Sequence, residues 1–371
     1  DSDKIFALRT VEDTLRLKKY TDEHQPKSAV VVGGGFIGIE VAENLRELGI
    51  DVTLVEAADQ LMAPFDRDMA SFIHTEIRKN GIHLMLDTMV EGFADTDCGI
   101  DVKLKNVPTL HTDMVVMAIG VAPETTLAKE AGLELGIKSS IVVNDKMETS
   151  IPDVYAVGDA VQITNFVTDK DTLISLAGPA NKQGRIAADN ICGGDSHYTG
   201  GQGSSIIKIF DMTAATTGIN EKTAKSLGIA TDKVILSPMS HAGYYPGGKM
   251  MTMKVLFEKE SYRILGAQIV GFDGVDKRID VLATAIRAGM KAYELTELDL
   301  AYAPPYSSAK DPVNMAGYII ENMKNGIVKQ WYYEEDETLS RDGSITLLDT
   351  RTPMEYSMGH VKGFINIPVD E

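Results

Sequence analysis

Cysteine is scarce in this sequence. The 371 residues contain only two, Cys98 and Cys192, which lie far apart in the chain. Their separation matches neither a CxxC redox pair nor the spacing of a zinc knuckle, which excludes a disulfide-rich scaffold and a cysteine zinc site. We expect two unpaired thiols in a reducing cytoplasm. No apolar run approaches the roughly 20 residues that a membrane-spanning helix needs, so no membrane partner is expected.

Positive charge is the second deficit. Lys and Arg total 36 against 54 Asp and Glu, which gives a formal net charge of −18. A polyanion such as DNA or RNA would be repelled on average, and no basic cluster offsets that repulsion, so nucleic acid is not an expected partner. The chain has neither an initiator Met nor a cationic segment followed by an apolar one. We therefore expect no export, and a first residue that marks a cut rather than a natural start.

The remaining composition, 44% apolar and 24% charged, is that of folded protein, and the length predicts two or three domains. The first part alternates between short apolar segments and helical patterns, as in the parallel sheet of an α/β fold. We predict strands at 29–32, 52–55, 82–86, 100–105, 113–119 and 155–157, and helices at 10–20, at 36–48 and after Asp66.

From about residue 205 the pattern changes to that of a different domain. Segments rich in β-branched and apolar residues predict an antiparallel sheet, helical patterns follow it, and residues 331–344 are acidic and aperiodic, as in a linker. The predicted strands lie at 206–210, 233–238, 251–257 and 264–270, and the helices at 276–289 and 311–324. This second part is therefore expected to be an α+β domain.

Three glycines spaced as G-x-G-x-x-G follow the first predicted strand. Gly33, Gly35 and Gly38 enclose Phe36 and Ile37 and lead into the predicted helix. In that context Gly33 permits a tight turn, Gly35 allows close approach of a pyrophosphate, and Gly38 lets helix and strand pack closely. The pyrophosphate would lie at the helix N-terminus, where free N–H groups favour negative charge. We predict a dinucleotide site, and a mere strand-to-helix turn is the alternative.

Glu56, at the end of the next predicted strand, indicates which dinucleotide binds. Its carboxylate can accept hydrogen bonds from both hydroxyls of a ribose, whereas it would repel a 2′-phosphate. Ala57 and Ala58 follow, and neither offers a positive charge to such a phosphate. We therefore predict NADH as the cofactor, with NADPH less favoured.

A second glycine and acid pair, Gly158 and Asp159, follows the segment TSIPDVYAV. The carboxylate can accept hydrogen bonds from a polyol, and Gly158 allows close approach; an aspartate that caps the next turn is the alternative. Residues 176–185, LAGPANKQGR, then indicate a loop that enters a helix. The N-terminus of that helix can stabilise negative charge on a bound ring, although an ordinary capped helix fits the same residues.

Six segments, taken in order, resemble the flavin-dependent pyridine nucleotide–disulfide oxidoreductases. They are GGGFIGIE, VEAADQLM, MAIGVAPE, TSIPDVYAVGDA, LAGPANKQGRIAADN and AYAPPYSSAKDPVNMAGY. Within that family the sequence looks most like the coenzyme A–disulfide reductase group, with NADH oxidases and NADH peroxidases as near relatives. The resemblance covers about residues 1–328. It implies an FAD domain interrupted by an NADH domain, and then a dimerisation domain that forms a homodimer.

The resemblance also implies roles for individual residues. Asp159 would hold the ribityl chain of FAD, Gly120 would contact NADH, and Glu40 would lie near the nicotinamide. The residues implied to lie beside the flavin ring run from Ala177 through Pro179 and Ala180 to Lys182.

Two features of that family are missing from this chain. Its members carry a first glycine-rich turn and one redox cysteine in the N-terminal part of the FAD domain, and neither Cys98 nor Cys192 matches that position. We therefore expect a fragment that lacks this half, binds FAD poorly and cannot complete the thiol chemistry alone.

Two loops carry pairs of tyrosines. Tyr302 and Tyr306 lie in YAPPYSSAK, and Tyr244 and Tyr245 lie in SHAGYYPGG. Phenols can donate a proton to a sulfur leaving group or hold a thiolate, but half-buried loop aromatics that only pack are the alternative.

By resemblance, one tyrosine from each loop reaches across the dimer to the partner's cysteine. Tyr302 and Tyr244 are the preferred matches, with Tyr306 and Tyr245 as alternates. Lys310 would contact coenzyme A. His241 is expected to be a hydrogen-bonded loop histidine rather than a catalytic one.

The last residues resemble a second family. Residues 345–371 are similar to the opening of a rhodanese domain, to which Asp349, Arg351 and His360 match. The catalytic cysteine loop of that family is not among these residues. Rhodaneses carry sulfane sulfur as a cysteine persulfide, which implies that a persulfide or polysulfide feeds the flavin site.

Together these observations predict an α/β protein with Rossmann-like FAD- and NAD(P)-binding domains, an α+β dimerisation domain and the start of a rhodanese α/β domain. The expected divisions are a lead-in helix and connection at 1–25, an NADH domain at 26–122, part of an FAD domain at 123–198, a dimerisation domain at 199–328, a linker at 329–344 and a truncated rhodanese domain at 345–371. The expected activity is reduction of coenzyme A disulfide, or of a coenzyme A persulfide or polysulfide, by NAD(P)H through FAD and a redox cysteine outside this chain. The alternatives are an NADH oxidase or peroxidase, and a non-catalytic NADH-binding fragment.

Overall fold

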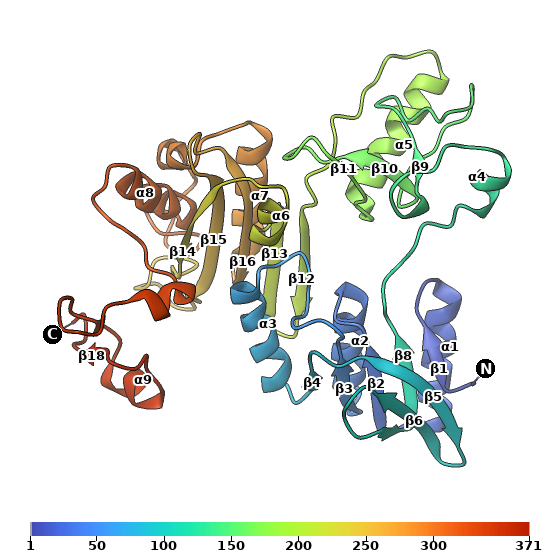
Figure 1. Ribbon diagram of the computed structural model, residues 1–371, viewed down its shortest axis with the longest axis horizontal. Coiled ribbons are helices and arrows are strands. Elements are labelled where there is room, and N and C mark those ends of the chain that lie inside the picture. Colours follow the sequence, from blue (N-terminus) through green and yellow to red (C-terminus); the bar gives the residue numbers. More distant parts are fainter. Residues whose placement is uncertain (1, 371) are drawn as a thin grey trace. The chain divides into compact units, whose positions relative to one another are not determined.

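The computed structural model describes residues 2–370 and forms two compact units (Figure 1). The first unit is Asp1–Glu321 and the second is Asn322–Glu371. Four sheets and the helices that accompany them make up most of the described part of the first unit, whereas the second unit is small. The sites discussed below lie in the first unit unless stated otherwise.

The first sheet is wholly parallel, with the strand order β1-β8-β2-β3-β4. Its central strands are apolar on both faces, since Val30, Val31, Val52 and Leu54 are all almost fully buried. Such strands need helices on their faces, which is why the glycine turn and its helix follow directly. The strands are β1 Ile5–Ala7, β2 Ser28–Val32, β3 Asp51–Val55, β4 His83–Met85 and β8 Met114–Met117.

Three helices accompany this sheet, at α1 Val11–His24, α2 Phe36–Glu47 and α3 Arg67–Lys79. Thr10 and Asp13 form the capping box that begins α1, with the Thr10 side chain accepting from the Asp13 N–H and the Asp13 carboxylate accepting from the Thr10 N–H. Between β4 and β8 the chain forms a small antiparallel sheet of β5 Val90–Thr96, β6 Gly99–Leu104 and β7 Leu110–Thr112.

The chain then builds a second, smaller region from α4 to α5. A three-stranded sheet in the order β11-β10-β9 lies before the long helix α5, Ala177–Ile191. The other elements are α4 Thr126–Glu130, the 3₁₀ turn η1 Ile137–Ser139, β9 Ile141–Val142, β10 Val161–Thr164 and β11 Asp171–Thr172. The predicted strand at 155–157 is wrong, because Tyr155 makes only one isolated antiparallel bridge, to Glu148, and no ladder follows.

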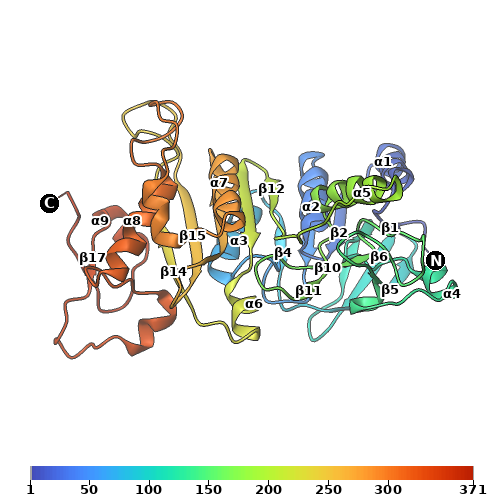
Figure 2. The same ribbon diagram turned by 90° about the horizontal axis from the view of Figure 1, so that it is seen from above.

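The second large sheet is wholly antiparallel, in the order β12-β13-β16-β15-β14. Helix α7 contacts β13 and β16, α3 contacts β12 and β16, and α2 contacts β12 (Figure 2). The elements are β12 Ser205–Ile209, β13 Met212–Gly218, α6 Glu221–Ser226, β14 Thr231–Leu236, β15 Met251–Glu258, β16 Ile264–Gly271, α7 Val275–Arg287, the 3₁₀ helix η2 Ala292–Glu297 and α8 Pro312–Lys324. The sequence prediction of an antiparallel sheet followed by two helices is confirmed, and β13 was missed.

A buried charge cluster fastens the first sheet region to the second sheet. The Lys254 ammonium, on β15, contacts the carboxylates of Asp66 at 3.0 Å and Asp68 at 2.8 Å, and that of Glu221. Burial opposes the charge of Lys254, but these carboxylates raise its pKa above the ordinary value. The three acids lie within 4.8 Å of one another, as metal ligands would, and the lysine supplies the cation that balances them.

In its described residues the second unit contains a short parallel strand pair, a short α-helix and a 3₁₀ helix. Strand β17 Leu348–Asp349 pairs with β18 Ile365–Asn366, and Thr352 and Glu355 form the capping box of α9 Pro353–Met358. The segment expected to be an aperiodic linker includes a 3₁₀ helix, η3 Tyr333–Thr338. Within the described residues no helix is both long and apolar enough to cross a bilayer. Both cysteines are free and exposed, as expected.

Candidate functional site

The glycine turn lies where β2 ends and α2 begins. Gly33 has φ +111° and its N–H donates to Val55 O at 2.8 Å. A Cβ at Gly33 would overlap Ala118 O, and a Cβ at Gly38 would overlap Gly33 O, so neither position accepts a side chain. Gly35 is exposed and has nothing within 4 Å of the place a Cβ would take. The backbone at Gly35 is therefore open to a ligand, as the sequence predicted.

Glu56 is tied to this turn. One carboxylate oxygen accepts the Gly34 N–H at 2.6 Å, and the other accepts the Ala58 N–H at 2.8 Å. Each oxygen keeps a second lone pair, so the carboxylate can still accept hydrogen bonds from two ribose hydroxyls. Glu56 thus closes the turn with two backbone hydrogen bonds, and its contact with a ribose stays a prediction.

The carboxyl ends of β2, β3 and β8 border a cavity of about 510 Å³. The ends of these parallel strands are where nucleotides bind in open α/β sheets. Gly33, Gly35, Glu56 and Gly120 all line this cavity, although Gly120 lies far from the others in sequence. An open glycine cradle with Glu56 at the end of β3 fits a dinucleotide, so the residues present fit NADH.

The other predicted residues of α2 lie outside that cavity. Phe36, the first residue of the helix, lines a separate cavity of about 680 Å³ together with Leu176, which immediately precedes α5. Ile37 and Glu40 are exposed and border a groove against α1. A position of Glu40 near a nicotinamide therefore stays a prediction.

The second glycine and acid pair lies beside the start of α5. Gly158 has φ +85°, and its N–H donates to the buried Gln183 side chain at 2.7 Å. A Cβ at Gly158 would meet only Ala180 Cβ, at 4.0 Å, and Asp159 is exposed. Ala177 begins the helix after Leu176, which gives no side-chain cap. Open backbone, a free acid and an uncapped helix start fit an FAD-type group.

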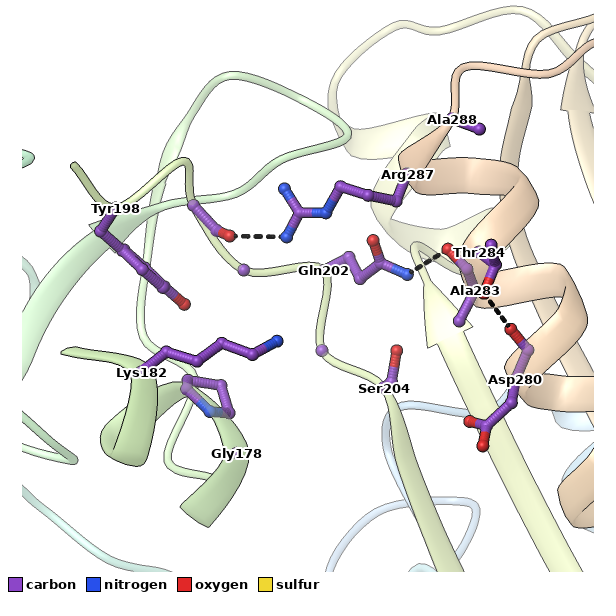
Figure 3. Close-up of a pocket in the computed structure, with 14 residues that line it drawn as sticks. Gly178, Lys182, Tyr198, Gln202, Ser204, Asp280, Ala283, Thr284, Arg287 and Ala288 are labelled. Carbon is purple, nitrogen blue, oxygen red and sulfur yellow. Dashed lines mark hydrogen bonds between the residues drawn. The ribbon is translucent and has the colours of Figure 1, made fainter. Parts of the chain in front are cut away.

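Lys182 and Pro179 face a cavity of about 620 Å³ between α5, residues 200–204 and α7 (Figure 3). Gln202 crosses it, donating to Ala283 O at 3.0 Å, while its own side-chain oxygen is buried without a hydrogen-bond partner in residues 2–370. Arg287 donates to Gly200 O at 2.9 Å from the other wall.

The two tyrosine loops meet. The hydroxyl oxygens of Tyr244 and Tyr302 lie 3.1 Å apart, so one phenol donates to the other. Tyr245 instead contacts the ring of His241 edge-on at 5.7 Å, and Tyr306 is 72% exposed. The structure thus brings together the preferred pair and leaves the two alternates apart from it. Lys310 lies in the same loop as Tyr306, just before α8, and is exposed.

A buried arginine that sequence reasoning missed holds both tyrosine loops. The Arg278 guanidinium, 1% exposed, donates to Ser240 O at 2.8 Å in one loop and to the Ser307 hydroxyl at 3.1 Å in the other. Asp311 accepts from Arg278 at 3.1 Å and from Ser307 at 2.6 Å. The signal was present, because Arg278 lies on the apolar face of α7 beside Ile279, and a buried charge requires a partner.

His241 is buried, and its Nδ1 lies 3.2 Å from Ala242 O, as a hydrogen-bonded loop histidine would.

In the second unit, the Asp349 carboxylate accepts hydrogen bonds from two side-chain nitrogens of Arg351, and the shorter of the two is 2.7 Å. His360 stacks on Tyr356 at 3.8 Å. Asp349, Arg351 and His360 border a shallow pocket together with Phe364.

Two sequence patterns of one known protein family match this chain. The sequence pattern described as pyridine nucleotide-disulphide oxidoreductase matches residues 1–184, and the pattern for the dimerisation domain of the same family matches residues 204–312. An NADH oxidase of Methanocaldococcus jannaschii is 38% identical over 85% of this chain and 70% of its own length. A coenzyme A disulfide reductase of Staphylococcus haemolyticus is 37% identical over 86% of this chain and 71% of its own length.

Two solved structures are also similar. Reduced CoADR-RHD of Bacillus anthracis has 49% identity and a TM-score of 0.94, covering 99% of this chain and 66% of that one. An NAD-dependent persulfide reductase of A. fulgidus has 37% identity and a TM-score of 0.93, covering 100% of this chain and 67% of that one. The chain therefore spans about two thirds of the length of these structures. It belongs to the pyridine nucleotide–disulfide oxidoreductase family, in the group of the coenzyme A disulfide reductases and NADH oxidases.

Proposed function

We propose that this chain is the NADH-binding and dimerising part of a flavoenzyme that reduces coenzyme A disulfide or a coenzyme A persulfide. The family uses FAD and NAD(P)H, and the relatives include a coenzyme A disulfide reductase and a persulfide reductase. The observation that carries the choice of a sulfur substrate is the Tyr244–Tyr302 contact of 3.1 Å on an exposed surface. Two phenols joined in this way present one free proton to a departing thiolate.

The residues of the chain divide the work. Gly33, Gly35 and the start of α2 bind the pyrophosphate, and Glu56 holds the adenosine ribose and selects NADH over NADPH. Gly120 borders the nicotinamide half of the same cavity. FAD, when bound, accepts a hydride and passes electrons to a thiol–disulfide centre. Asp159 holds its ribityl chain, and the first turns of α5, from Ala177 to Lys182, orient and neutralise its ring.

The homodimer completes the sulfur site. Tyr244 and Tyr302 act on the redox cysteine of the partner subunit, and Lys310 binds an anionic group of coenzyme A. The exposure of the pair, 77% for Tyr244 and 47% for Tyr302, supports a role at a surface that a second copy covers. The match of residues 204–312 to the dimerisation domain supports the same assembly.

The redox cysteine is proposed to come from outside residues 1–371. Neither Cys98 nor Cys192 lines the three cavities that border the glycine turn, Phe36 and Lys182. The second unit is proposed to be the start of a rhodanese domain, in which the Asp349–Arg351 pair fixes the first strand and its turn. The scarcity of cysteine favours a reducing, cytoplasmic compartment.

These roles follow a division of the chain that we also propose. Residues 26–122 bind NADH and residues 123–198 belong to the FAD domain, while residues 199–328 form the dimer and residues 329–344 link it to the second unit. Residues 1–25 precede the NADH domain, although β1 joins its sheet beside β8.

The test measures anaerobic NADH oxidation by the FAD-loaded enzyme that contains this chain, with coenzyme A disulfide and coenzyme A persulfide as acceptors. We expect turnover with at least one of them to exceed the rate with oxygen by about tenfold or more. Tyr244→Phe and Tyr302→Phe should lower kcat for the sulfur acceptor and leave reduction of the flavin by NADH unchanged, because the phenols act after that step.

The oxidase alternative has a distinct outcome. NADH oxidation that is no faster with either sulfur acceptor than with oxygen would overturn the proposal in favour of an NADH oxidase. NADH binding to the 371-residue chain without FAD uptake or turnover would describe a binding fragment. Equal loss of flavin reduction and sulfur turnover in the tyrosine variants would remove Tyr244 and Tyr302 from the proposed step.

A further inference from the structure

Cys98, His111 and Asp101 form a cluster on the small antiparallel sheet, away from the cavities described above. Cys98 occupies the turn between β5 and β6, Asp101 lies on β6, and His111 lies on β7. The Cys98 sulfur lies 3.6 Å from His111 Nε2, and His111 Nδ1 lies 2.9 Å from an Asp101 oxygen. A thiol, an imidazole and a carboxylate therefore follow one another in hydrogen-bonding order.

The strand register builds this order. Asp101 and His111 are direct partners across β6 and β7, so their side chains emerge on the same face of the sheet. Gly99 precedes Asp101 by two residues and shares that face. A Cβ at Gly99 would lie 2.9 Å from His111 Nε2 and 3.0 Å from Cε1, closer than such atoms approach. The glycine therefore leaves the space through which the imidazole reaches Cys98.

The hydrogen bond to Asp101 also settles what each imidazole nitrogen does. A carboxylate only accepts hydrogen bonds, so Nδ1 carries the hydrogen that it donates to Asp101. In the neutral ring Nε2 is then an acceptor, and it faces the thiol. This is the arrangement of an activated nucleophile, a base and a group that orients the base.

The surroundings leave the sulfur accessible. Cys98 is exposed, and the side chains of His111 and Asp101 are 49% and 41% exposed. The ammonium of Lys4, the residue before β1, donates to Thr96 O at 3.1 Å and to Gly99 O at 3.2 Å, which places a positive charge beside the turn. Asp97 is the acid of the turn itself.

We propose that Cys98 is a nucleophilic thiol that exchanges with low-molecular-weight disulfides, with His111 as its base and Asp101 as the residue that orients His111. His111 Nε2 takes the thiol proton, and the sulfur of Cys98 attacks one sulfur of the disulfide. The S–S bond of that disulfide breaks as a mixed disulfide forms on Cys98, and the other half leaves as a thiolate that takes up the proton. Cys98 is oxidised and the released thiol is reduced, so no further oxidant is needed.

This exchange site is separate from the redox cysteine of the proposed function, and it requires neither FAD nor NADH. Its product, a thiol adduct on the sheet that lies between β4 and β8, would be a covalent modification of the NADH-binding region. The chemical class of partner is any small disulfide, including glutathione disulfide and coenzyme A disulfide.

Cys192 is the internal control. It caps the C-terminal end of α5, is exposed, and its thiol has no hydrogen-bond partner among residues 2–370. The reduced 371-residue protein is treated with glutathione disulfide at pH 7, and the mixed disulfide at each cysteine is followed by peptide mass spectrometry. Cys192→Ser and Cys98→Ser variants isolate each thiol, and thiol release from 5,5′-dithiobis(2-nitrobenzoate) gives a second rate.

We expect Cys98 to react about tenfold faster than Cys192. His111→Ala should reduce the Cys98 rate to that of Cys192 and leave Cys192 unchanged, and Asp101→Asn should reduce it partially. His83→Ala, which removes an exposed histidine from β4, should change neither rate. Unfolding curves that match the parent protein show that the loss in His111→Ala is chemical. Equal rates at the two cysteines, or a Cys98 rate that His111→Ala does not lower, would overturn the proposal.

Discussion

The hydroxyl groups of Tyr244 and Tyr302 lie 3.1 Å apart, although 58 residues separate them in the chain. Tyr244 belongs to the loop between β14 and β15, and Tyr302 belongs to the loop between η2 and α8, so the hydrogen bond joins two separate loops. This hydrogen bond is the main cause that raises the pKa of Tyr302 above its ordinary value of 10.0, with burial second. The raised pKa keeps the Tyr302 hydroxyl protonated at neutral pH, so that it retains the proton that a donor to a thiolate needs.

Tyr244→Phe should lower the pKa of Tyr302 toward its ordinary value, because the hydrogen bond that stabilises the neutral phenol is lost. Titration followed by the NMR signals of ring-labelled tyrosine would resolve Tyr302 from the other phenols. Tyr245→Phe is the matched control, since Tyr245 contacts His241 rather than Tyr302. A Tyr302 pKa that is the same in the parent and in Tyr244→Phe would show that the pair is not formed in solution.

Arg278→Met should destabilise the protein strongly, because Asp311, 2% exposed, would remain buried without its partner. Burial alone disfavours the charged carboxylate, but hydrogen bonds from Ser307, Val313 and Arg278 hold the pKa of Asp311 below its usual range. Breaking one half of a buried ion pair costs about 3–5 kcal/mol in the free energy of unfolding. Urea denaturation measures this change.

Lys277→Met provides the comparison for Arg278. The Lys277 ammonium lies 3.7 Å from the same Asp311 oxygen but is 35% exposed, so its loss should cost less than about 1 kcal/mol. Similar losses in the two variants would mean that Arg278 does not anchor the two tyrosine loops.

Sequence reasoning found the parts of this site that have local patterns. Gly33, Gly35 and Gly38 have a fixed spacing, and the structure has the predicted turn between a strand and a helix there, while nucleotide binding at that turn stays a prediction. The position of Arg278 on an apolar helix face indicates a buried charge that needs a partner, but the partners themselves, Ser240 and Asp311, could not be predicted because they are set by how two loops fold against one helix. Long-range contacts of this kind leave no periodicity in the chain.

The same limit explains the errors in the fold. Strand β13, MTAATTG, consists mainly of small and polar residues, and its place is fixed by the two strands that flank it, β12 and β16. Residues 155–157 have strand-like composition but find no neighbour that extends the bridge from Tyr155 to Glu148. The hydrogen-bonding order of Cys98, His111 and Asp101 likewise follows from register across β6 and β7.

Glu56→Ala should weaken NADH binding and lower the preference for NADH over NADPH by about tenfold, since two ribose hydrogen bonds are lost and the repulsion of a 2′-phosphate is removed. Fluorescence titration of the chain with each nucleotide measures the ratio. Glu56→Gln keeps an oxygen for one backbone N–H and should retain more of the turn than Glu56→Ala. Glu47→Ala, an exposed acid at the end of α2, should leave the ratio unchanged. An unchanged ratio in Glu56→Ala would place Glu56 outside the nucleotide site.

The buried side chain of His74 makes the stability of the first sheet region depend on pH. The ring is 7% exposed, and its Nε2 accepts the Leu61 N–H at 3.0 Å. Burial lowers the pKa of His74 from 6.5 to about 4. Above pH 6.5 the ring is neutral in both the folded and the unfolded chain, so it leaves stability unchanged there.

Below pH 6.5 the unfolded chain binds a proton that the folded chain does not, so the stabilisation from neutral His74 is lost as the pH falls toward 4. His74→Gln keeps a side-chain oxygen that can accept the Leu61 N–H but removes this titration. We therefore expect the difference in free energy of unfolding between parent and variant to be constant above pH 6.5 and to shift in favour of the variant between pH 6.5 and 4. Urea denaturation at several pH values measures that difference, and a difference that does not change with pH would show that His74 titrates alike in both states.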